Sequence, residues 1–202
     1  MFTGIVQGIA ELYCIQEEKN IRTYIFKMPS PFLEGLQIGY SVANNGCCLT
    51  VTKITGDHVS FDLVTETLLK TNLGVLNVGD TVNIERAAKF SDEIGGHFVS
   101  GHIMSTAIIT RIYNKKSNYT MWLTIDFFEK KKYIFYKGFI TIDGISLTVG
   151  EVTQKEFCVH LVPETLLRTT LGQKNIGCKV NIEFDLNTQV IVDTIERVLM
   201  TR

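Results

Sequence analysis

The sequence predicts an all-β protein: two homologous antiparallel barrels in tandem, followed by a C-terminal α-helix. Three observations support this prediction. The chain repeats itself once, each copy consists mostly of short β-branched or aromatic runs separated by glycine turns, and the last residues have a helical pattern that the first copy lacks.

The repeat appears when the sequence is shifted by 98 residues, which aligns residues 42–85 with 140–183 without a gap. Residues 63–71 (LVTETLLKT) then lie over 161–169 (LVPETLLRT). A shift of 97 places Thr3-Gly4 over Ser100-Gly101. Two copies are too few for a solenoid, so we expect two self-contained domains. They are residues 1–97 and 98–186, joined near Gly95-Gly96, with residues 187–202 as a C-terminal helix.

Within the first copy, four runs are typical of strands. They are residues 24–26, 49–52, 59–63 and 81–84. One short helix per copy is expected at 66–73 and 164–171, with Gly74 and Gly172 as C′ residues. Many short strands with one small helix favour a closed or nearly closed antiparallel barrel.

The tail has Ile191, Ile195, Val198 and Leu199 on one helical face, and either Asp185 or Asn187 could cap its start. Such a helix either packs on its own barrel or mediates oligomerisation, and the residues alone leave both open.

Composition excludes several classes of protein. The chain has 20 basic and 21 acidic residues and no basic run longer than 130–132, which argues against nucleic-acid binding. No apolar stretch approaches the roughly 20 residues of a membrane helix, and residues 1–6 do not resemble a secretion signal.

The five cysteines are odd in number and contain no C-x-x-C spacing, so neither a disulfide framework nor a metal site is expected, and free thiols fit the cytoplasm. They are Cys14, Cys47, Cys48, Cys158 and Cys178.

Polar residues recur at matching places of two apolar strands. Cys48 and Thr50 are two residues apart and share a face, as do Ser146 and Thr148, while Ser41 lies nearby. They are either ordinary strand residues or ligand-binding groups, since a hydroxyl inside a barrel needs a partner.

Two of the four histidines, His97 and His102, lie in the glycine-rich junction 95–102. They are either proton carriers near a ligand or linker residues bonded to the backbone. His58 follows a turn and is expected to be solvated, whereas His160 faces a core or a ligand. Lys137 and Asp143 precede the strand that carries Ser146 and Thr148. The default interpretation of Lys137 is a surface ion pair, and that of Asp143 is a turn residue.

Four segments in order resemble the riboflavin synthase family of lumazine-binding barrels: 1–5, 42–51, 95–102 and 137–149. The resemblance implies two six-stranded antiparallel Greek-key barrels, a C-terminal trimerisation helix and a homotrimer whose sites lie between subunits. It implies that one 6,7-dimethyl-8-ribityllumazine donates four carbons to another, giving riboflavin and 5-amino-6-(D-ribitylamino)uracil, in the last step of riboflavin biosynthesis. No cofactor is required.

The resemblance also implies two substrate pockets, one per barrel. The first is expected to be lined by Cys48, Leu49, Thr50, Asp62, Leu63, Val64, Thr65, Glu66, Thr67, Gly101, His102 and Ile103, with Lys137 reaching it from a neighbour. The second is expected to be lined by Gly4, Ile5, Val6, Ser146, Leu147, Thr148, Val162, Pro163, Glu164, Thr165, Leu166 and Leu167.

The catalytic hypothesis follows from the same positions. His102, with Thr148, moves the proton of the acidic C7 methyl group. Ser146 or Cys48 supplies or stabilises the nucleophile that adds at C7 of the donor. Ser41, Asp143 and Asp185 orient these groups.

Three alternatives stay open. A non-catalytic antenna-type protein would bind lumazine or flavin with one decayed pocket, whereas the polar positions remain in both copies here. A flavin-binding barrel of an electron-transfer protein predicts an attached nucleotide-binding domain, for which no residues remain. A purely structural barrel leaves the paired polar positions unexplained.

Overall fold

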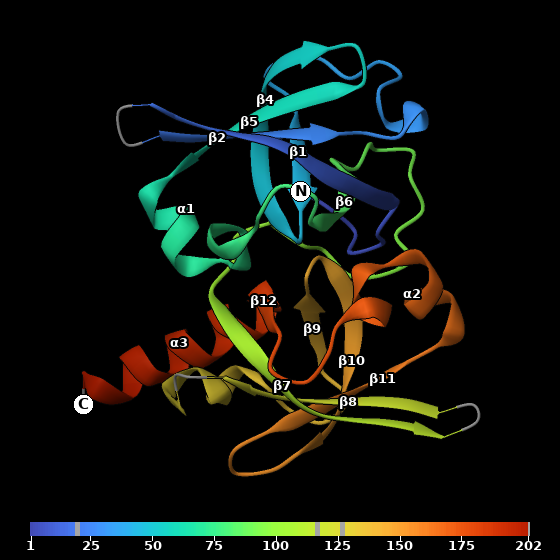
Figure 1. Cartoon of the computed structure of the whole chain (residues 1–202). Helices are drawn as coiled ribbons and strands as arrows, with labels where there is room; N and C mark the ends of the chain where they lie inside the picture. Colours follow the sequence, from blue (N-terminus) through green and yellow to red (C-terminus); the bar gives the residue numbers. More distant parts are fainter. Residues whose placement is uncertain (19–20, 116–117, 126–127, 202) are drawn as a thin grey trace.

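The computed structural model describes residues 1–18, 21–115, 118–125 and 128–201. It contains two closed barrels, one above the other in Figure 1. The first consists of β1 (Gly8–Glu18), β2 (Ile21–Lys27), β3 (Ser41–Asn44), β4 (Cys47–Thr55), β5 (His58–Val64) and β6 (Thr81–Arg86). The second consists of β7 (Ser105–Lys115), β8 (Asn118–Ile125), β9 (Phe139–Ile142), β10 (Ile145–Val152), β11 (Phe157–Leu161) and β12 (Lys179–Phe184).

Both barrels have the same strand order. The first closes as β1-β2-β5-β4-β3-β6 and the second as β7-β8-β11-β10-β9-β12. In each, three hairpin-connected strands are followed by a fourth that returns beside the first of them, which is a Greek key. All pairings within the barrels are antiparallel. The predicted fold class is confirmed, and the expected domain boundary at residues 97–98 falls in the segment that connects β6 to β7.

The short helices end earlier than predicted. They are α1 (Thr65–Lys70) and α2 (Pro163–Arg168), each followed by a 3₁₀ turn, η2 (Asn72–Val75) or η4 (Thr170–Gln173). Thr71 ends α1 because its backbone is extended, and its hydroxyl accepts a hydrogen bond from Leu73 N at 3.1 Å. Gly74 therefore lies inside η2 and not at a C′ position, and its lack of a Cβ leaves room for the carbonyl oxygen of Leu68. Gly172 has the same role in η4.

Alternation along the strands separates two cores from an outer surface. In β4, Leu49 and Val51 are buried inside the first barrel, whereas Cys48 and Thr50 point outward. In β10, Leu147 and Val149 are buried in the same way in the second barrel. The paired polar positions thus face the outside of their barrels, and a ligand that contacts them must lie on that outer surface.

The two barrels meet through a nearly symmetrical polar network. The Nδ2 atoms of Asn83 and Asn181 donate to the backbone carbonyls of Asp143 and Asn45, at 2.8 and 2.9 Å. Asn45 and Asp143 have positive φ angles of 46° and 45° and each precedes a glycine, as expected for tight hairpin turns. The last strand of each barrel therefore donates a hydrogen bond to the equivalent turn of the other barrel, in an approximately two-fold arrangement.

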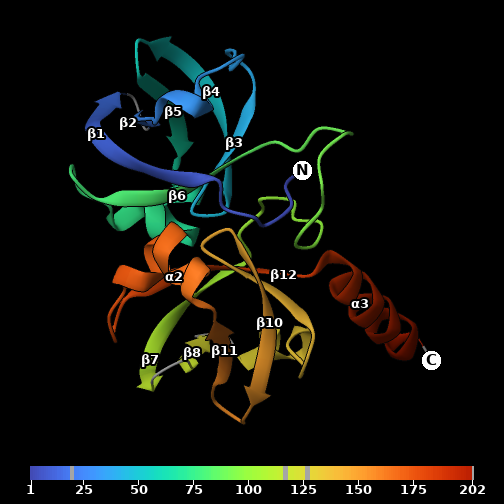
Figure 2. The same ribbon diagram turned by 90° about the vertical axis from the view of Figure 1, so that its right-hand side faces the viewer.

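The tail forms α3 (Leu186–Met200), capped by Asp185, whose carboxylate accepts from Thr188 N at 2.9 Å. Tyr133, at the end of η3 (Phe128–Tyr133), donates to Asp193 at 2.5 Å. Lys132 forms ion pairs with Asp193 and Glu196. Figure 2 shows that the rest of α3 extends away from the barrels. Within the described residues, no helix has both the length and the apolar character required to cross a membrane. The remaining short element, η1 (Ser30–Phe32), lies between β2 and β3.

Candidate functional site

The candidate sites form where the segment that precedes one barrel crosses onto the outer face of the other. The carbonyl of Gly101, just before β7, accepts from Cys48 N of the first barrel at 2.8 Å. The carbonyl of Gly4, just before β1, accepts from Ser146 N of the second barrel at 2.7 Å. Each site is therefore built from both sequence copies. This accounts for the presence of Gly101–Ile103 in the predicted first pocket and of Gly4–Val6 in the predicted second pocket.

The first pocket is a cavity of about 230 Å³ beside β4 and α1. Its lining is Cys47, Cys48, Glu66, Thr67, Lys70, Thr71, Gly101, His102 and Ile103. Of these, Cys47, Lys70 and Thr71 were not among the predicted lining residues. Lys70 forms an ion pair with Glu66 at 2.9 Å. Burial raises the pKa of the Cys47 thiol to about 12, so this cysteine is not a thiolate nucleophile at neutral pH.

The other residues predicted for the first pocket, and the predicted orienting residue Ser41, do not line this cavity. The side chains of Leu49 and Leu63 belong to the core of the first barrel. Asp62 accepts a hydrogen bond from Thr23 at 2.7 Å. Ser41 and Thr50 are cross-strand partners on the outer face, next to the pocket in the strand register. Val64 and Thr65 are exposed at the start of α1.

The second site is centred on Ser146 and His97. The hydroxyl of Ser146 lies 2.7 Å from Nδ1 of His97, and the hydroxyl of Thr141 lies 3.2 Å from Nε2. The imidazole stacks on Phe139 with the ring centroids 4.9 Å apart. Burial lowers the pKa of His97, an effect that the nearby Asp185 partly opposes. The neutral imidazole is therefore the favoured form at neutral pH.

The sequence predicted Ser146 at this site and left His97 open between a proton carrier and a linker residue bonded to the backbone. Phe139 and Thr141 were missed as site residues. Thr148, the cross-strand partner of Phe139, is exposed on the same outer face. Ser146 and Thr148 thus share one surface, as their spacing predicted.

The remaining residues predicted for the second pocket divide into three groups. Leu147 is buried in the second barrel, and Val6 and Leu166 pack against its core. Ile5, Val162, Pro163, Glu164 and Leu167 are exposed, with Glu164 paired to Arg168 along α2. Thr165 is half-buried, and its carbonyl accepts from the Thr169 hydroxyl at 2.6 Å.

Asp143 lies between the barrels and not in either pocket. Its Oδ1 accepts from Asn181 N at 2.7 Å and from the amide of Asn72 at 2.8 Å. Its Oδ2 is buried without a hydrogen bond and lies 3.7 Å from Nζ of Lys174. Burial raises the pKa of Asp143 to about 6, while Lys174 acts in the opposite direction. These contacts give Asp143 a role in joining the barrels.

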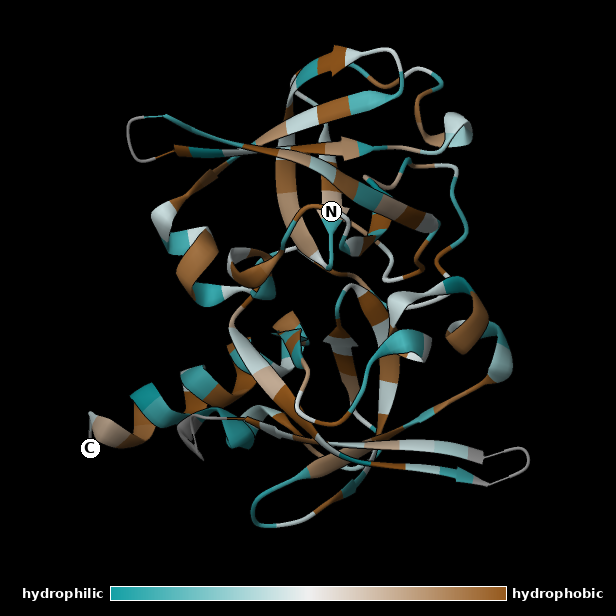
Figure 3. Ribbon diagram, in the orientation of Figure 1, coloured by the Kyte–Doolittle hydropathy of each residue, from teal (hydrophilic) through white to brown (hydrophobic). Residues whose placement is uncertain are grey.

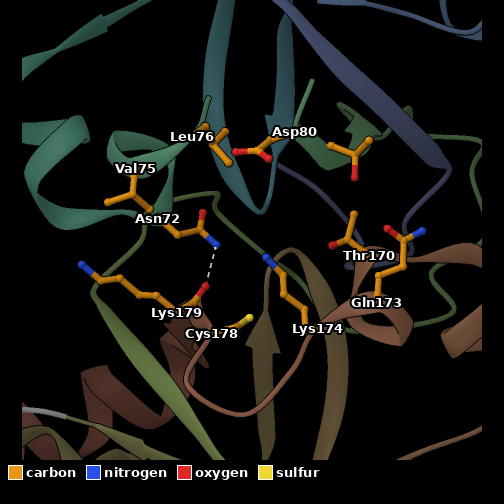
Figure 4. A pocket seen from close by; sticks show the side chains of 10 residues that line it. Asn72, Val75, Leu76, Asp80, Thr170, Gln173, Lys174, Cys178 and Lys179 are labelled. Atoms are coloured by element: carbon orange, nitrogen blue, oxygen red, sulfur yellow. Dashed lines mark hydrogen bonds between the residues drawn. The ribbon is translucent and has the colours of Figure 1, made fainter. Parts of the chain in front are cut away.

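Lys174 also lines a cavity of about 270 Å³ at the junction of the barrels (Figure 4). Asn72 and Thr170, which occupy equivalent positions of the two copies, lie on its opposite sides. The hydroxyl of Thr170 is buried and has no hydrogen-bond partner among the described residues. This cavity contains none of the predicted pocket residues.

Lys137 is exposed, and its ammonium lies 5.3 Å from the centroid of the Tyr136 ring. The sequence left open whether His160 faces a core or a ligand. It is exposed, and its Nδ1 lies 3.0 Å from the hydroxyl of Thr120. His58 is the first residue of β5, and its Nδ1 lies 2.8 Å from the carboxylate of Asp57. Its ring packs against Tyr13 with the centroids 4.3 Å apart and its Nε2 is buried, so the expectation of a solvated side chain is wrong. In the described part of the chain, no three His, Cys, Asp or Glu side chains are grouped so that they could hold a metal ion.

Comparison with known proteins agrees with this geometry. The model of the lumazine binding domain family matches residues 3–87 and 100–185, one match per barrel. Riboflavin synthase of Escherichia coli K12 is 62% identical over 202 residues, covering 100% of this chain and 95% of that protein.

Solved structures are also similar. LumP complexed with riboflavin superposes with a TM-score of 0.84 at 28% identity, covering 92% of this chain and all of the other. LumP complexed with 6,7-dimethyl-8-(1′-D-ribityl) lumazine gives a TM-score of 0.81 at 28% identity, covering 92% and 99%. With two matched domains and a relative of this identity along its whole length, the chain belongs to the riboflavin synthase family of lumazine-binding barrel proteins.

Proposed function

We propose that the chain catalyses the dismutation of two 6,7-dimethyl-8-ribityllumazine molecules to riboflavin and 5-amino-6-(D-ribitylamino)uracil. The observation that carries this proposal is the presence of matching polar positions, Cys48 and Ser146, on the outer faces of the two barrels, in a chain 62% identical to a riboflavin synthase. A reaction between two identical molecules needs two similar pockets. The products together contain the same atoms as the two substrates, so no oxidant or reductant has to be supplied.

Positioning accounts for much of the expected rate enhancement. Holding two rings in alignment makes the encounter effectively unimolecular, which can remove about 7–11 kcal/mol of the barrier. The polar groups of the first pocket, such as Thr67 and His102, are available to the ribityl hydroxyls or to the ring. The outward-facing Ser41, Thr50 and Thr148 extend the two polar surfaces.

The pair His97 and Ser146 supplies acid–base chemistry in the second site. With Nε2–H donating to Thr141, Nδ1 accepts the Ser146 hydroxyl proton, and a neutral imidazole is ready to take it. Ser146 then acts as, or stabilises, the nucleophile that adds at C7 of the donor lumazine. His102 with Thr148 moves the methyl proton, and Asp185 influences the charge of His97. Cys48 holds the matching position in the first pocket.

We further propose a homotrimer in which the first pocket of one subunit faces the second pocket of its neighbour, with Lys137 reaching across. The support is the exposed apolar side of α3, which continues beyond its contacts with η3 (Figure 3). This side consists of Ile191, Ile195, Val198 and Leu199. Leu186, Val190 and Met200 are exposed apolar residues elsewhere on the helix. All five cysteines are free thiols, and we expect the protein in the cytoplasm.

A second candidate is a non-catalytic protein that binds lumazine or flavin, which the similarity to the ligand-bound LumP structures favours. One assay distinguishes the two. The purified chain is incubated with 6,7-dimethyl-8-ribityllumazine without added cofactor, and riboflavin is followed by absorbance. Formation of one riboflavin for every two substrates consumed supports the synthase. Tight binding without product supports the binding protein, and neither binding nor product contradicts both.

A further inference from the structure

Two buried carboxylates hold the crossing segments that complete the pockets. Glu85 on β6 is 3% exposed, and Glu183 on β12 is 4% exposed. They occupy equivalent positions of the two copies. Neither belongs to the family motifs that the sequence pointed to, and the mechanism above does not use them.

Each carboxylate accepts three hydrogen bonds from one short segment. Glu85 accepts from Thr3 N at 2.6 Å, from the Thr3 hydroxyl at 2.8 Å and from Gly4 N at 3.1 Å. Glu183 accepts from Ser100 N at 2.7 Å, from the Ser100 hydroxyl at 2.7 Å and from Gly101 N at 3.0 Å. Hydrogen bonds to an ionised acceptor are among the stronger ones in proteins, so both segments are firmly fixed.

The same segments then contact the pocket of the opposite barrel. Gly101, held by Glu183 of the second barrel, bonds to Cys48 of the first. Gly4, held by Glu85 of the first barrel, bonds to Ser146 of the second. The geometry of each pocket thus depends on a carboxylate that belongs to the other barrel.

These contacts leave little room for adjustment. Gly101 has φ +83°, and a Cβ there would lie 2.6 Å from Cβ of Cys48. Gly4 has φ +74°, and a Cβ there would lie 2.6 Å from Cβ of Ser146. Because the segments lie directly on the pocket strands, a small displacement changes where His102 and Ile5, the next residues, project.

We propose that Glu183 is a positioning residue for the first pocket and Glu85 for the second, so that each barrel sets the lumazine-binding geometry of the other. The inference rests on the proposed function for its kinetic part only. Neither carboxylate has to touch the substrate, because each acts through the backbone of the segment that it holds.

The test compares Glu183→Gln and Glu85→Gln in the full chain, with Glu18→Gln at an exposed strand end as control. Glutamine keeps the shape of the side chain but places an amide N–H where one of the donors now points. The first measurement is amide hydrogen exchange of segments 3–6 and 100–103. Glu183→Gln is expected to accelerate exchange at least tenfold in 100–103 only, and Glu85→Gln in 3–6 only.

The second measurement is steady-state turnover of 6,7-dimethyl-8-ribityllumazine. Loss of a charge-assisted contact that aligns the substrate is expected to lower kcat/KM by about tenfold or more in both variants. Should either glutamine variant fail to fold, Ser100→Ala and Thr3→Val each remove one of the three bonds. Ser100→Ala is expected to accelerate exchange in 100–103 only and Thr3→Val in 3–6 only, each with a smaller loss of kcat/KM than the glutamine variant.

Unchanged exchange in both segments, or acceleration of both segments in each variant, overturns the crosswise arrangement. Faster exchange with wild-type kcat/KM shows that the carboxylates are merely structural and also overturns the proposal. A wild-type chain that makes no riboflavin refutes the proposed function instead, while the exchange pattern still tests the crosswise contacts independently.

Discussion

His97 lies against Ser146, with 2.7 Å between its Nδ1 and the serine hydroxyl, although 49 positions separate the two residues in the sequence. The linker between the barrels carries the histidine onto the outer face of the second barrel, where Phe139 and Thr141 fix the ring. A contact of this kind links a potential base to a potential nucleophile.

This contact predicts that His97→Gln lowers kcat by about 100-fold, since a positioned acid–base group typically contributes that much or more. Ser146→Ala is expected to lower kcat to a similar extent, and the double variant little further, because the two groups act as one unit. Steady-state assays check this, with His58→Gln at the start of β5 in the first barrel as the control. Additive losses in the double variant would contradict the coupling.

The buried pair Asp143 and Lys174 leads to a prediction about stability. The equivalent residues of the first copy are Asn45 and Leu76, so the chain itself contains an uncharged version of the arrangement. Lys174→Leu leaves a buried carboxylate without its cation and is expected to destabilise the chain by about 3 kcal/mol at pH 8. Adding Asp143→Asn recreates the pair of the first copy and should restore most of the loss. Denaturant unfolding of the single and double variants measures both effects.

The raised pKa of Asp143 makes part of the stability pH-dependent. Its ordinary value of 3.8 rises to about 6 in the folded chain, so the folded state binds the proton more tightly. The contribution of this group to stability therefore decreases as pH rises from about 4 to about 6. His97 has the opposite effect, because burial lowers its pKa below the ordinary value of 6.5 and the folded state resists protonation. Its contribution to stability is therefore lost as pH falls below about 6.5. Measuring the free energy of unfolding of the wild type and of Asp143→Asn at pH 5 and pH 7 separates the contribution of Asp143 from that of His97. If the free energy of unfolding changes equally with pH in both proteins, Asp143 is not the source of the change.

The fold was largely predictable because the chain carries its own internal comparison. The 98-residue repeat predicted two equivalent domains, and the strand order of the barrels confirms this equivalence. Helix ends were predicted less well, because the stop comes from the side-chain hydrogen bonds of Thr71 and Thr169 and not from the glycines. Alternation within β4 was a usable signal: once Cys48 and Thr50 were assigned to one face, Leu49 had to lie on the other.

The site was predictable only where the repeat aligns with itself. Cys48 and Ser146 were found in this way, as were Gly4 and Gly101. His97 was one of two candidate proton carriers, but its contact with Ser146 could not be predicted, because the residue has no counterpart at the repeat shift and only the tertiary path of the chain brings the two together. The contacts of Asp143 were also beyond the sequence, because Asn72, Asn181 and Lys174 come from distant segments and meet it only where the barrels join.

The exposed apolar side of α3 predicts that assembly depends on this helix. Ile195 and Val198 are 54% and 51% exposed, so replacing both by aspartate should leave the fold intact while making subunit contact unfavourable. Light scattering after gel filtration is expected to show a trimer for the wild type and a monomer for the variant, with turnover at least tenfold lower. Ile176→Asp, in an exposed turn, is the control. A variant that stays trimeric and fully active would exclude α3 from the interface.

If each working site combines the first pocket of one subunit with the second pocket of another, two inactive chains should restore activity when assembled together. His102→Gln damages only the first pocket, and Ser146→Ala damages only the second. In a mixed trimer, the intact first pocket of the Ser146→Ala chain faces the intact second pocket of the His102→Gln chain, which creates some undamaged sites. Co-expression with two different affinity tags isolates such mixed trimers for assay. Turnover clearly above that of either parent supports the inter-subunit site. Turnover equal to the mean of the parents would mean that both pockets of a working site come from one chain, because then every site in the mixture carries a lesion.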